Sequence, residues 1–329
     1  MFKYAVLAAL ACLSLASPSR AADQSFQDWL AQVKTDAVAA GLDQAVVDKA
    51  LADVQPIDKV IENDRKQSEF TLTFEQYMER VVSDKRVKDG RERLAKNRAA
   101  IEKIAAREGV PAGQIVAMWG IESDYGRAMG NFHVLSALAT LAYDGRRSAF
   151  FRGELMKALT MVSQGVPPDH MQGSWAGAMG QCQFMPSTYL NFAQSNSGQG
   201  PADIWSNSED VWASTAHYLA SLNWKRDEGW GMAVKLPKHG MAEALYGLER
   251  ARPARDWERL GLRTLAGRKL PGAPERRLAL IHADAGRDGT GGTGPVFLVG
   301  GNFRAIMQWN RSFFFALAAG SLADRIASR

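Results

Sequence analysis

The sequence lacks the residue patterns on which several classes of protein depend. It has two cysteines, Cys12 and Cys182, and five histidines, no two of them at metal-ligand spacing. It contains no HExxH segment, no GxSxG elbow and no phosphate-binding glycine loop. These absences argue against a zinc enzyme, an α/β serine hydrolase and a nucleotide-binding fold. Cys182 has no histidine in its local motif, which argues against a cysteine protease.

One turn resembles part of a calcium site. Ser195 to Gly200 has the length of the first half of a calcium loop, with Gly200 at its sharp turn. Ser and Gln stand where such a loop needs carboxylates, and Asp203 lies beyond the turn. We therefore expect a structural turn, no bound metal and no cofactor.

The chain also lacks a strong excess of charge of one sign. Its 40 Lys and Arg residues stand against 35 Asp and Glu, a net charge of +5. The basic residues between Lys85 and Arg93 are spaced as on a solvated helix face, not as a nucleic-acid patch. We expect no nucleic-acid partner, although the mild positive charge suits an anionic polymer.

Long apolar runs are absent except at the N-terminus. Lys3 precedes an apolar run from Tyr4 to Ala16, and Ser19-Arg20-Ala21 follows with small residues where signal peptidase reads. This pattern predicts a signal peptide over residues 1–21, with residues 22–329 as the exported chain. Ala9 is a poor lipobox residue, so we expect no lipid anchor at Cys12. No segment reaches membrane-spanning length, and we expect none to cross a membrane.

Helical periodicity dominates the rest of the chain. We expect helices over 25–33, 43–51, 91–108, 134–143, 150–162, 208–222 and 302–325, and one beginning at Ser187 or Thr188. Two short strands are expected near 278–281 and 296–299, and residues 231–275 stay unassigned. The predicted class is α+β, mostly helical.

Trp119 to Arg127 contains a carboxylate in an apolar setting. Pro111 is expected to open a helix that Gly126 stops, which places Glu122 in its last turn beside Met118, Trp119 and Ile121. Poor solvation and the negative end of the helix dipole would both raise the pKa of Glu122, as a general acid requires. The alternative is an ordinary glutamate that caps or salt-bridges a helix end.

A glycosidase of the ordinary kind needs a second carboxylate. Asp124 is the nearest in sequence, but on a continuing helix it would point about 200° away from Glu122. A mechanism with one acid remains open if the substrate supplies its own nucleophile. Tyr and Trp residues could form sugar-stacking platforms, although by base rate most belong to the core.

Three segments then carry a resemblance to a known family. They are Trp119-Gly-Ile-Glu122-Ser-Asp-Tyr125-Gly-Arg127, Leu138 to Tyr143, and the long stretch from Gly173-Ser174 through Gln183 to Tyr189. With further matches upstream and downstream, residues 25–325 resemble the lytic murein transglycosylase B family. The resemblance implies a lysozyme-like catalytic core at about 96–230, with additional helical and small β segments packed around it.

The resemblance also implies a reaction. The enzyme would cleave the β-1,4 bond between N-acetylmuramic acid and N-acetylglucosamine in peptidoglycan and leave a 1,6-anhydro ring. Glu122 matches the catalytic acid, which would then act as the base. The alternatives that stay open are a muramidase-type hydrolase and a non-catalytic protein that binds the cell wall.

Other residues of this sequence match single positions that bind substrate in the family. Those expected to bind substrate are Ser174 and Gln183 beside the acid, Tyr77, Tyr218 and Asn310 in the cleft, and Arg146 and Arg147 toward peptide-stem carboxylates. Two positions depart from the family, because Trp309 and Phe315 stand where tyrosines are common. The implied setting is a periplasmic monomer acting on glycan strands, with cell-wall synthesis or division proteins as possible partners.

Overall fold

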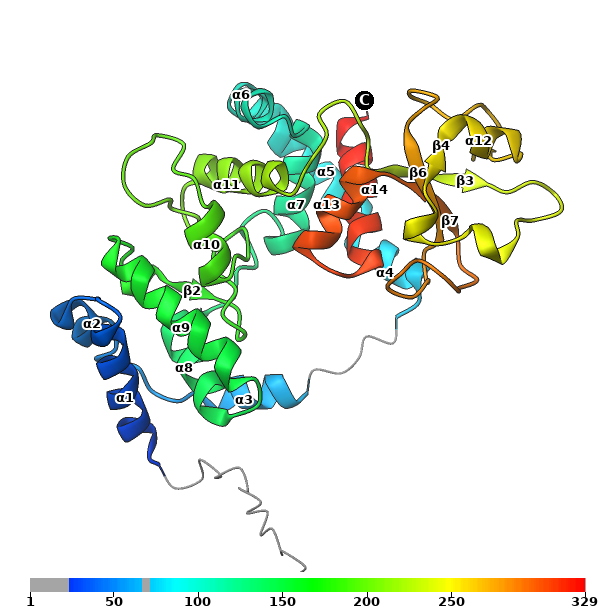
Figure 1. Cartoon of the computed structure of the whole chain (residues 1–329). Coiled ribbons are helices and arrows are strands. Elements are labelled where there is room, and N and C mark those ends of the chain that lie inside the picture. Colours follow the sequence, from blue (N-terminus) through cyan, green and yellow to red (C-terminus); the bar gives the residue numbers. More distant parts are fainter. Residues whose placement is uncertain (1–23, 67–71, 329) are drawn as a thin grey trace, which may run out of the picture.

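The computed structural model describes residues 24–66 and 72–328, and Figure 1 shows their arrangement. The predicted signal peptide and Cys12 lie outside these ranges. The described residues are mostly helical, with a small sheet, and this confirms the predicted α+β class. None of their helices is long and apolar enough to cross a membrane.

The first helices are α1 (Phe26–Ala39), α2 (Gln44–Ala50), α3 (Asp58–Arg65), α4 (Phe74–Val81), α5 (Asp84–Lys96), α6 (Arg98–Glu108) and α7 (Ala112–Ser123). They are followed by α8 (Val134–Asp144), α9 (Ser148–Ser163), α10 (Pro186–Phe192), α11 (Ser208–Ser221), α12 (Ala254–Arg259), α13 (Gly301–Trp309) and α14 (Phe313–Ala327). Ser25 and Asp43, where two of the expected helices begin, are N-caps, since each side chain accepts a bond from a first-turn amide.

The prediction of one continuous helix over 91–108 was wrong, because this segment contains the end of α5 and all of α6, which meet at Asn97. The Asn97 side-chain amide donates to the Arg93 carbonyl at 2.9 Å. Its backbone, at φ −113° and ψ 20°, leaves the helical region. Asparagine competes for backbone groups in this way, and apolar periodicity does not detect it. The chain therefore turns between α5 and α6.

The sheet has five antiparallel strands in the order β4-β6-β7-β3-β5. Strands β6 (Arg277–His282) and β7 (Val296–Val299) confirm the two predicted strands. Strands β3 (Gly231–Lys235), β4 (Arg252–Pro253) and β5 (Arg263–Thr264) lie in the segment that the sequence left unassigned, and β4 and β5 have only two residues each. A further two-stranded ladder pairs β1 (Phe132–His133) with β2 (Gln172–Gly173).

Strand β6 is buried on both faces, which explains its continuous apolar run. Leu278 and Leu280 belong to a small core around Trp257, whereas Ala279 and Ile281 belong to the main core. Alternate residues of a strand point to opposite faces, so the sheet separates the two cores. The sheet thereby attaches a small lobe to the helical body.

Helix α7 lies at the centre of the main core. Nine of its residues are buried, and α14 packs along it. Gly113 allows this close approach, because a Cβ there would lie 3.0 Å from the Ala323 carbonyl oxygen. The C-terminal helix thus shares one core with the helix that carries Glu122.

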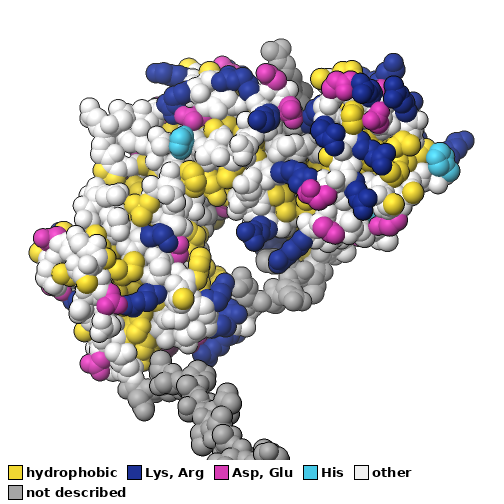
Figure 2. All heavy atoms as spheres, viewed as in Figure 1, with side chains coloured by type: hydrophobic (Ala, Val, Ile, Leu, Met, Phe, Trp, Pro, Cys, Tyr) yellow, Lys and Arg dark blue, Asp and Glu magenta, His cyan; other side chains and the backbone are white. Residues whose placement is uncertain are grey.

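A hollow opens near the middle of the face in Figure 2. Lys and Arg side chains gather on both of its sides, toward α13 and α14 and toward α3 and α8.

Candidate active site

Helix α7 delivers Glu122 from its last turn. The helix ends at Ser123, because Asp124 and Tyr125 both have positive φ, 51° and 60°. The expectation that Gly126 would stop it was therefore wrong by two residues. The amides of Asp124 and Tyr125 bond back to the carbonyls of Gly120 and Trp119, which closes the helix end.

Glu122 lies in an environment that disfavours its charge. Its side chain is largely enclosed yet keeps part of its surface exposed. Burial raises the pKa of Glu122 to about 8, and a hydrogen bond from Trp309 opposes that rise in part. The predicted direction is confirmed, and desolvation is its cause. At neutral pH the carboxyl group therefore keeps its proton for most of the time.

Trp309 is the hydrogen-bond partner of Glu122. Its indole Nε1 donates to Glu122 Oε1 at 2.7 Å, across 187 residues of chain. The ring also lies beside Tyr218 and Phe184, with centroids 4.8 and 5.4 Å away. Tyr218 in turn stacks on Phe192 at 4.5 Å. An aromatic wall thus extends from the acid along α10 and α11.

Asp124 does not share a site with Glu122. Its carboxylate accepts from Arg127 at 2.8 Å and lies 3.6 Å from Arg86. The Arg127 hydrogen bond holds the pKa of Asp124 below its ordinary value. Among the described residues, no second carboxylate contributes to the pKa of Glu122. Asp124 therefore does not form a carboxylate pair with Glu122.

The glycine-rich segment after β2 is hydrogen-bonded to the last turn of α7, which carries Glu122. The Gln181 side chain accepts from Trp119 Nε1 at 2.8 Å and donates to the Trp205 carbonyl at 2.8 Å. Ser123 Oγ donates to the Gln181 carbonyl at 2.8 Å. Gln181 therefore connects the end of α7 to the glycine-rich segment, a role that sequence reasoning did not assign to it.

Ser174 and Gln183, both predicted to face the sugar, make mostly local bonds in this structure. Ser174 Oγ accepts from the Ala178 amide at 3.1 Å. Gln183 has φ 51°, and its Nε2 donates to the carbonyls of Met129 and Gly180 at 2.9 and 2.8 Å. These bonds do not use the hydroxyl proton of Ser174 or the side-chain oxygen Oε1 of Gln183, so both groups can bond to a ligand.

The approach of Gly130 to Gly173 is so close that a side chain would disrupt it. A Cβ on Gly130, which has φ +89°, would lie 2.1 Å from the Gly173 carbonyl oxygen. We expect Gly130→Ala to lower the unfolding free energy by about 2–4 kcal/mol, through backbone strain plus overpacking. Urea denaturation checks this value. Gly145→Ala is the control, because Gly145 also has a positive φ, +95°, but a Cβ there would meet no atom within 4 Å. If both variants lost the same unfolding free energy, the packing argument would be contradicted.

Tyr77 and Asn310 were also predicted to bind substrate. The Tyr77 ring is 5.5 Å from Phe314, and burial, followed by the nearby charge of Glu122, raises the pKa of Tyr77. Asn310 follows α13 in an extended conformation, and its Oδ1 accepts from the Ser312 amide at 3.1 Å. Tyr218 thus lies beside Trp309, Asn310 follows Trp309 in the chain, and Tyr77 is close enough to Glu122 to feel its charge.

Arg146 and Arg147 already have a carboxylate partner. Both bond to Asp64 of α3, Arg146 at 2.5 Å and Arg147 at 2.6 Å, and Asp64 is buried. The Arg146 hydrogen bond is the main reason that the pKa of Asp64 is lowered. Each arginine keeps about half of its side chain exposed, so contact with substrate stays a prediction.

The turn that resembles a calcium loop is held by hydrogen bonds within itself and to Asp210 of α11. Ser195 Oγ contacts Ser197 Oγ at 3.0 Å, and the Asn196 and Asp203 amides both donate to Asp210, at 2.8 Å each. Asp203 accepts from the amides of Trp205 and Ser206. Within the described ranges, no three His, Cys, Asp or Glu side chains are grouped to hold a metal.

Cys182 is buried, and desolvation raises the pKa of its thiol to about 12. It is therefore no nucleophile at neutral pH.

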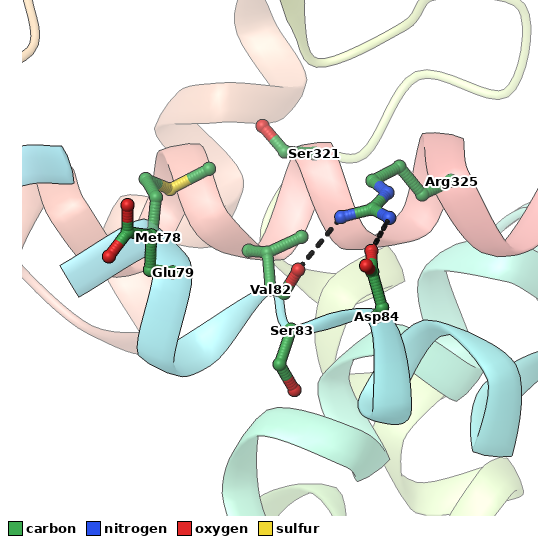
Figure 3. Close-up of a pocket in the computed structure, with 7 residues that line it drawn as sticks. All are labelled: Met78, Glu79, Val82, Ser83, Asp84, Ser321 and Arg325. Atoms are coloured by element: carbon green, nitrogen blue, oxygen red, sulfur yellow. Dashed lines mark hydrogen bonds and ion pairs between the residues drawn. The ribbon is translucent and has the colours of Figure 1, made fainter. Parts of the chain in front are cut away.

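A cavity of about 430 Å³ between α4 and α14 does not include Glu122 in its lining. In Figure 3, Arg325 crosses this cavity to the Val82 carbonyl and to Asp84, at 2.8 and 2.6 Å.

Comparison with known proteins gives a consistent assignment. A family model described as the transglycosylase SLT domain matches residues 25–324. Membrane-bound lytic murein transglycosylase B of Escherichia coli is 33% identical over 226 residues, which cover 67% of this chain. The matched region spans 58% of that protein's length.

Solved structures agree with this match. SltB3 of Pseudomonas aeruginosa, in complex with NAG-anhNAM-pentapeptide, is 41% identical with a TM-score of 0.86, covering 92% of this chain and 79% of that one. Escherichia coli lytic transglycosylase Slt35, in complex with calcium, is 27% identical with a TM-score of 0.73, covering 91% and 92%. The chain therefore belongs to the transglycosylase SLT domain family, as its resemblance to the lytic murein transglycosylase B family implied.

Proposed function

We propose that the protein is a peptidoglycan lytic transglycosylase that cleaves the β-1,4 bond between N-acetylmuramic acid and N-acetylglucosamine and forms 1,6-anhydromuramoyl ends. One observation carries the proposal. Glu122 lies beside an aromatic wall, burial raises its pKa to about 8, and within residues 24–66 and 72–328 no second carboxylate acts on it. Such a site can donate one proton and later recover one, but it offers no protein nucleophile.

The first step is protonation of the leaving group. Trp309 donates to Glu122 Oε1, so the proton of the neutral carboxyl group resides on Oε2 and is free to point toward substrate. Transfer of this proton to the glycosidic oxygen breaks the bond from that oxygen to C1 of the muramoyl residue. The N-acetylglucosamine portion leaves with a new hydroxyl group, and C1 develops oxocarbenium character.

The second step uses the same residue as a base. Glu122 is now a carboxylate and removes the proton of the muramoyl C6 hydroxyl as O6 bonds to C1. The ring closes, no water is consumed and Glu122 regains its proton. Trp309 assists at this stage, because its N–H bond stabilises the carboxylate formed between the steps.

The binding roles that we propose belong to the residues that match the family's substrate-binding positions. We propose that Tyr218 and Tyr77 provide apolar faces for sugar rings, and that Ser174, Gln183 and Asn310 bond to sugar amides and hydroxyls. Arg146 and Arg147 would meet stem-peptide carboxylates. SltB3, the 41% identical relative, was solved with NAG-anhNAM-pentapeptide, which supports a ligand of this class.

The setting follows from this substrate. We propose a periplasmic enzyme that acts as a monomer on glycan strands and that cell-wall synthesis or division proteins recruit.

Digestion of purified sacculi tests the proposed activity. The protein should release soluble muropeptides without a matching rise in reducing ends. Release with a matching rise would indicate a muramidase, and binding without release would indicate a non-catalytic wall protein.

A further inference from the structure

The small lobe carries the excess positive charge of the chain. From Leu248 to Arg277 there are nine Lys and Arg residues but only four Asp and Glu, an excess of five. This excess equals the net charge of the whole chain, so the remaining residues balance one another. The segment contains β4 and α12, which lie on the far side of the molecule from α1 and α2 in Figure 1. The charge asymmetry of the chain therefore belongs to one lobe.

Carboxylates neutralise few of these positive charges. Asp256 pairs with Arg255 and Arg259, and Glu275 pairs with Arg255. Among residues 24–66 and 72–328, seven others have no carboxylate oxygen within 4.0 Å; they are Arg250, Arg252, Arg263, Arg268, Lys269, Arg276 and Arg277. Five of the seven are exposed. The lobe therefore presents positive charge to its surroundings.

Exposed apolar side chains stand among these charges. Leu265 is 68% exposed and Leu260 is 37% exposed. Leu265 lies in a turn that Thr264 and Arg268 close, because the Thr264 amide donates to the Arg268 carbonyl at 3.0 Å. Arg268 lines the same cavity as Leu265, so the two side chains are neighbours. A hydrogen-bonded turn thus holds an exposed leucine next to an exposed cation.

This surface offers no aromatic platform. Trp257, the one aromatic residue from Leu248 to Arg277, is fully buried, and its Nε1 donates to the Leu278 carbonyl. Single-stranded nucleic acid is bound by stacking on exposed aromatic rings, and a glycan strand would need ring faces such as that of Tyr218. Cations around an exposed leucine instead match an anionic bilayer, whose headgroups attract Lys and Arg and whose acyl boundary accepts aliphatic side chains.

We propose that this lobe binds the surface of a bilayer that contains anionic phospholipid. Leu265 enters the boundary between headgroups and acyl chains, and Arg268 and Lys269 lie beside lipid phosphates. Insertion of one leucine is weak on its own, so binding requires charge and insertion together. The interaction uses neither Glu122 nor the residues assigned to the glycan. It goes beyond the proposed function, because it concentrates the enzyme at a membrane surface.

Sedimentation with lipid vesicles tests the proposal. The protein used is the predicted exported chain, residues 22–329, so that the apolar run from Tyr4 to Ala16 cannot insert. It should sediment with vesicles made of equal parts of phosphatidylcholine and phosphatidylglycerol, and it should stay in solution with phosphatidylcholine alone. Raising the salt concentration should weaken binding, because salt screens exposed charges.

Two sets of substitutions should weaken binding to the anionic vesicles. Arg268→Gln combined with Lys269→Gln removes two exposed charges and should weaken binding about thirtyfold, at about fivefold for each charge. Leu265→Ser should weaken binding about tenfold, because the inserted apolar surface is lost. All three positions are exposed, so the variants should fold as the wild type does.

Matched controls remove the same groups elsewhere. Lys96→Gln combined with Lys103→Gln removes two charges from exposed positions on α5 and α6, and Phe150→Ser removes an exposed apolar side chain from α9. Both controls should bind as the wild type does. Equal weakening by a lobe variant and its control would overturn the proposal, as would no binding or equal binding to the two kinds of vesicle.

Sacculi separate this proposal from the proposed function. The lobe variants should release muropeptides from sacculi at the wild-type rate, whereas failure of the proposed function would appear as a wild-type protein that releases none. If Arg268→Gln combined with Lys269→Gln weakened binding to sacculi and left binding to vesicles unchanged, the surface would belong to the wall, and the proposal would be overturned.

Discussion

Replacing Glu122 by Gln should lower the rate of glycan cleavage by at least about a thousandfold, which corresponds to about 4 kcal/mol of activation free energy. Glutamine keeps the shape of the side chain and can still accept the Trp309 hydrogen bond, but it has no acidic proton. Both proposed steps need that proton, first on the leaving oxygen and then recovered from the C6 hydroxyl. The measurement is the initial rate of muropeptide release from sacculi.

Asp124→Asn is the matched control for this prediction. Asp124 lies two residues away, but it bonds to Arg127 and has positive φ, which asparagine tolerates. We expect its cleavage rate to stay within about tenfold of wild type, since Asp124 has no role in the chemistry. If Asp124→Asn were as inactive as Glu122→Gln, a two-carboxylate mechanism would replace the one proposed here.

Replacing Trp309 by Phe should have the second largest effect. The substitution keeps an aromatic ring beside Tyr218 and removes the one side-chain hydrogen bond that the Glu122 carboxyl group has among the described residues. Hydrogen bonds to charged groups contribute about 1.5–3 kcal/mol, so we expect kcat to fall by about tenfold to a hundredfold. The loss arises because the carboxylate formed between the two steps is less stabilised.

The same substitution should shift the pH profile in a defined direction. Glu122 must be protonated to act as an acid, so kcat/KM should fall as pH rises through its pKa of about 8. The Trp309 bond lowers that pKa, and its removal should move the alkaline limb to higher pH. Trp309→Tyr, which keeps a donor, should restore part of the rate. A limb that stays in place or moves to lower pH would contradict this role.

Much of the site could be predicted because its signals are local. The apolar neighbours of Glu122 indicated the raised pKa, and the structure confirms the helices expected to begin at Ser25 and Asp43. Strands β6 and β7 were found because each is a continuous apolar run bounded by turn residues. In each case the determining residues lie within a few positions of one another.

The remaining features depend on contacts between distant segments. The sequence showed that Trp309 stands where the family often has a tyrosine. Its bond to Glu122 could not be predicted, because the two residues are 187 positions apart and no local sequence pattern links them. The partner of Arg146 and Arg147 is Asp64, about 80 residues upstream, for the same reason. Strands β4 and β5 have two residues each, too few for an alternation to be visible.

The most direct test of the central claim is the mass of the product formed in water enriched in heavy oxygen. If the muramoyl C6 hydroxyl closes the ring, the released muropeptides are one water lighter than hydrolysis products and carry no label. Glu122 is then the sole acid and base, as we propose. Products with an unmodified reducing end that carries one heavy oxygen would contradict the account, because water would then be the nucleophile.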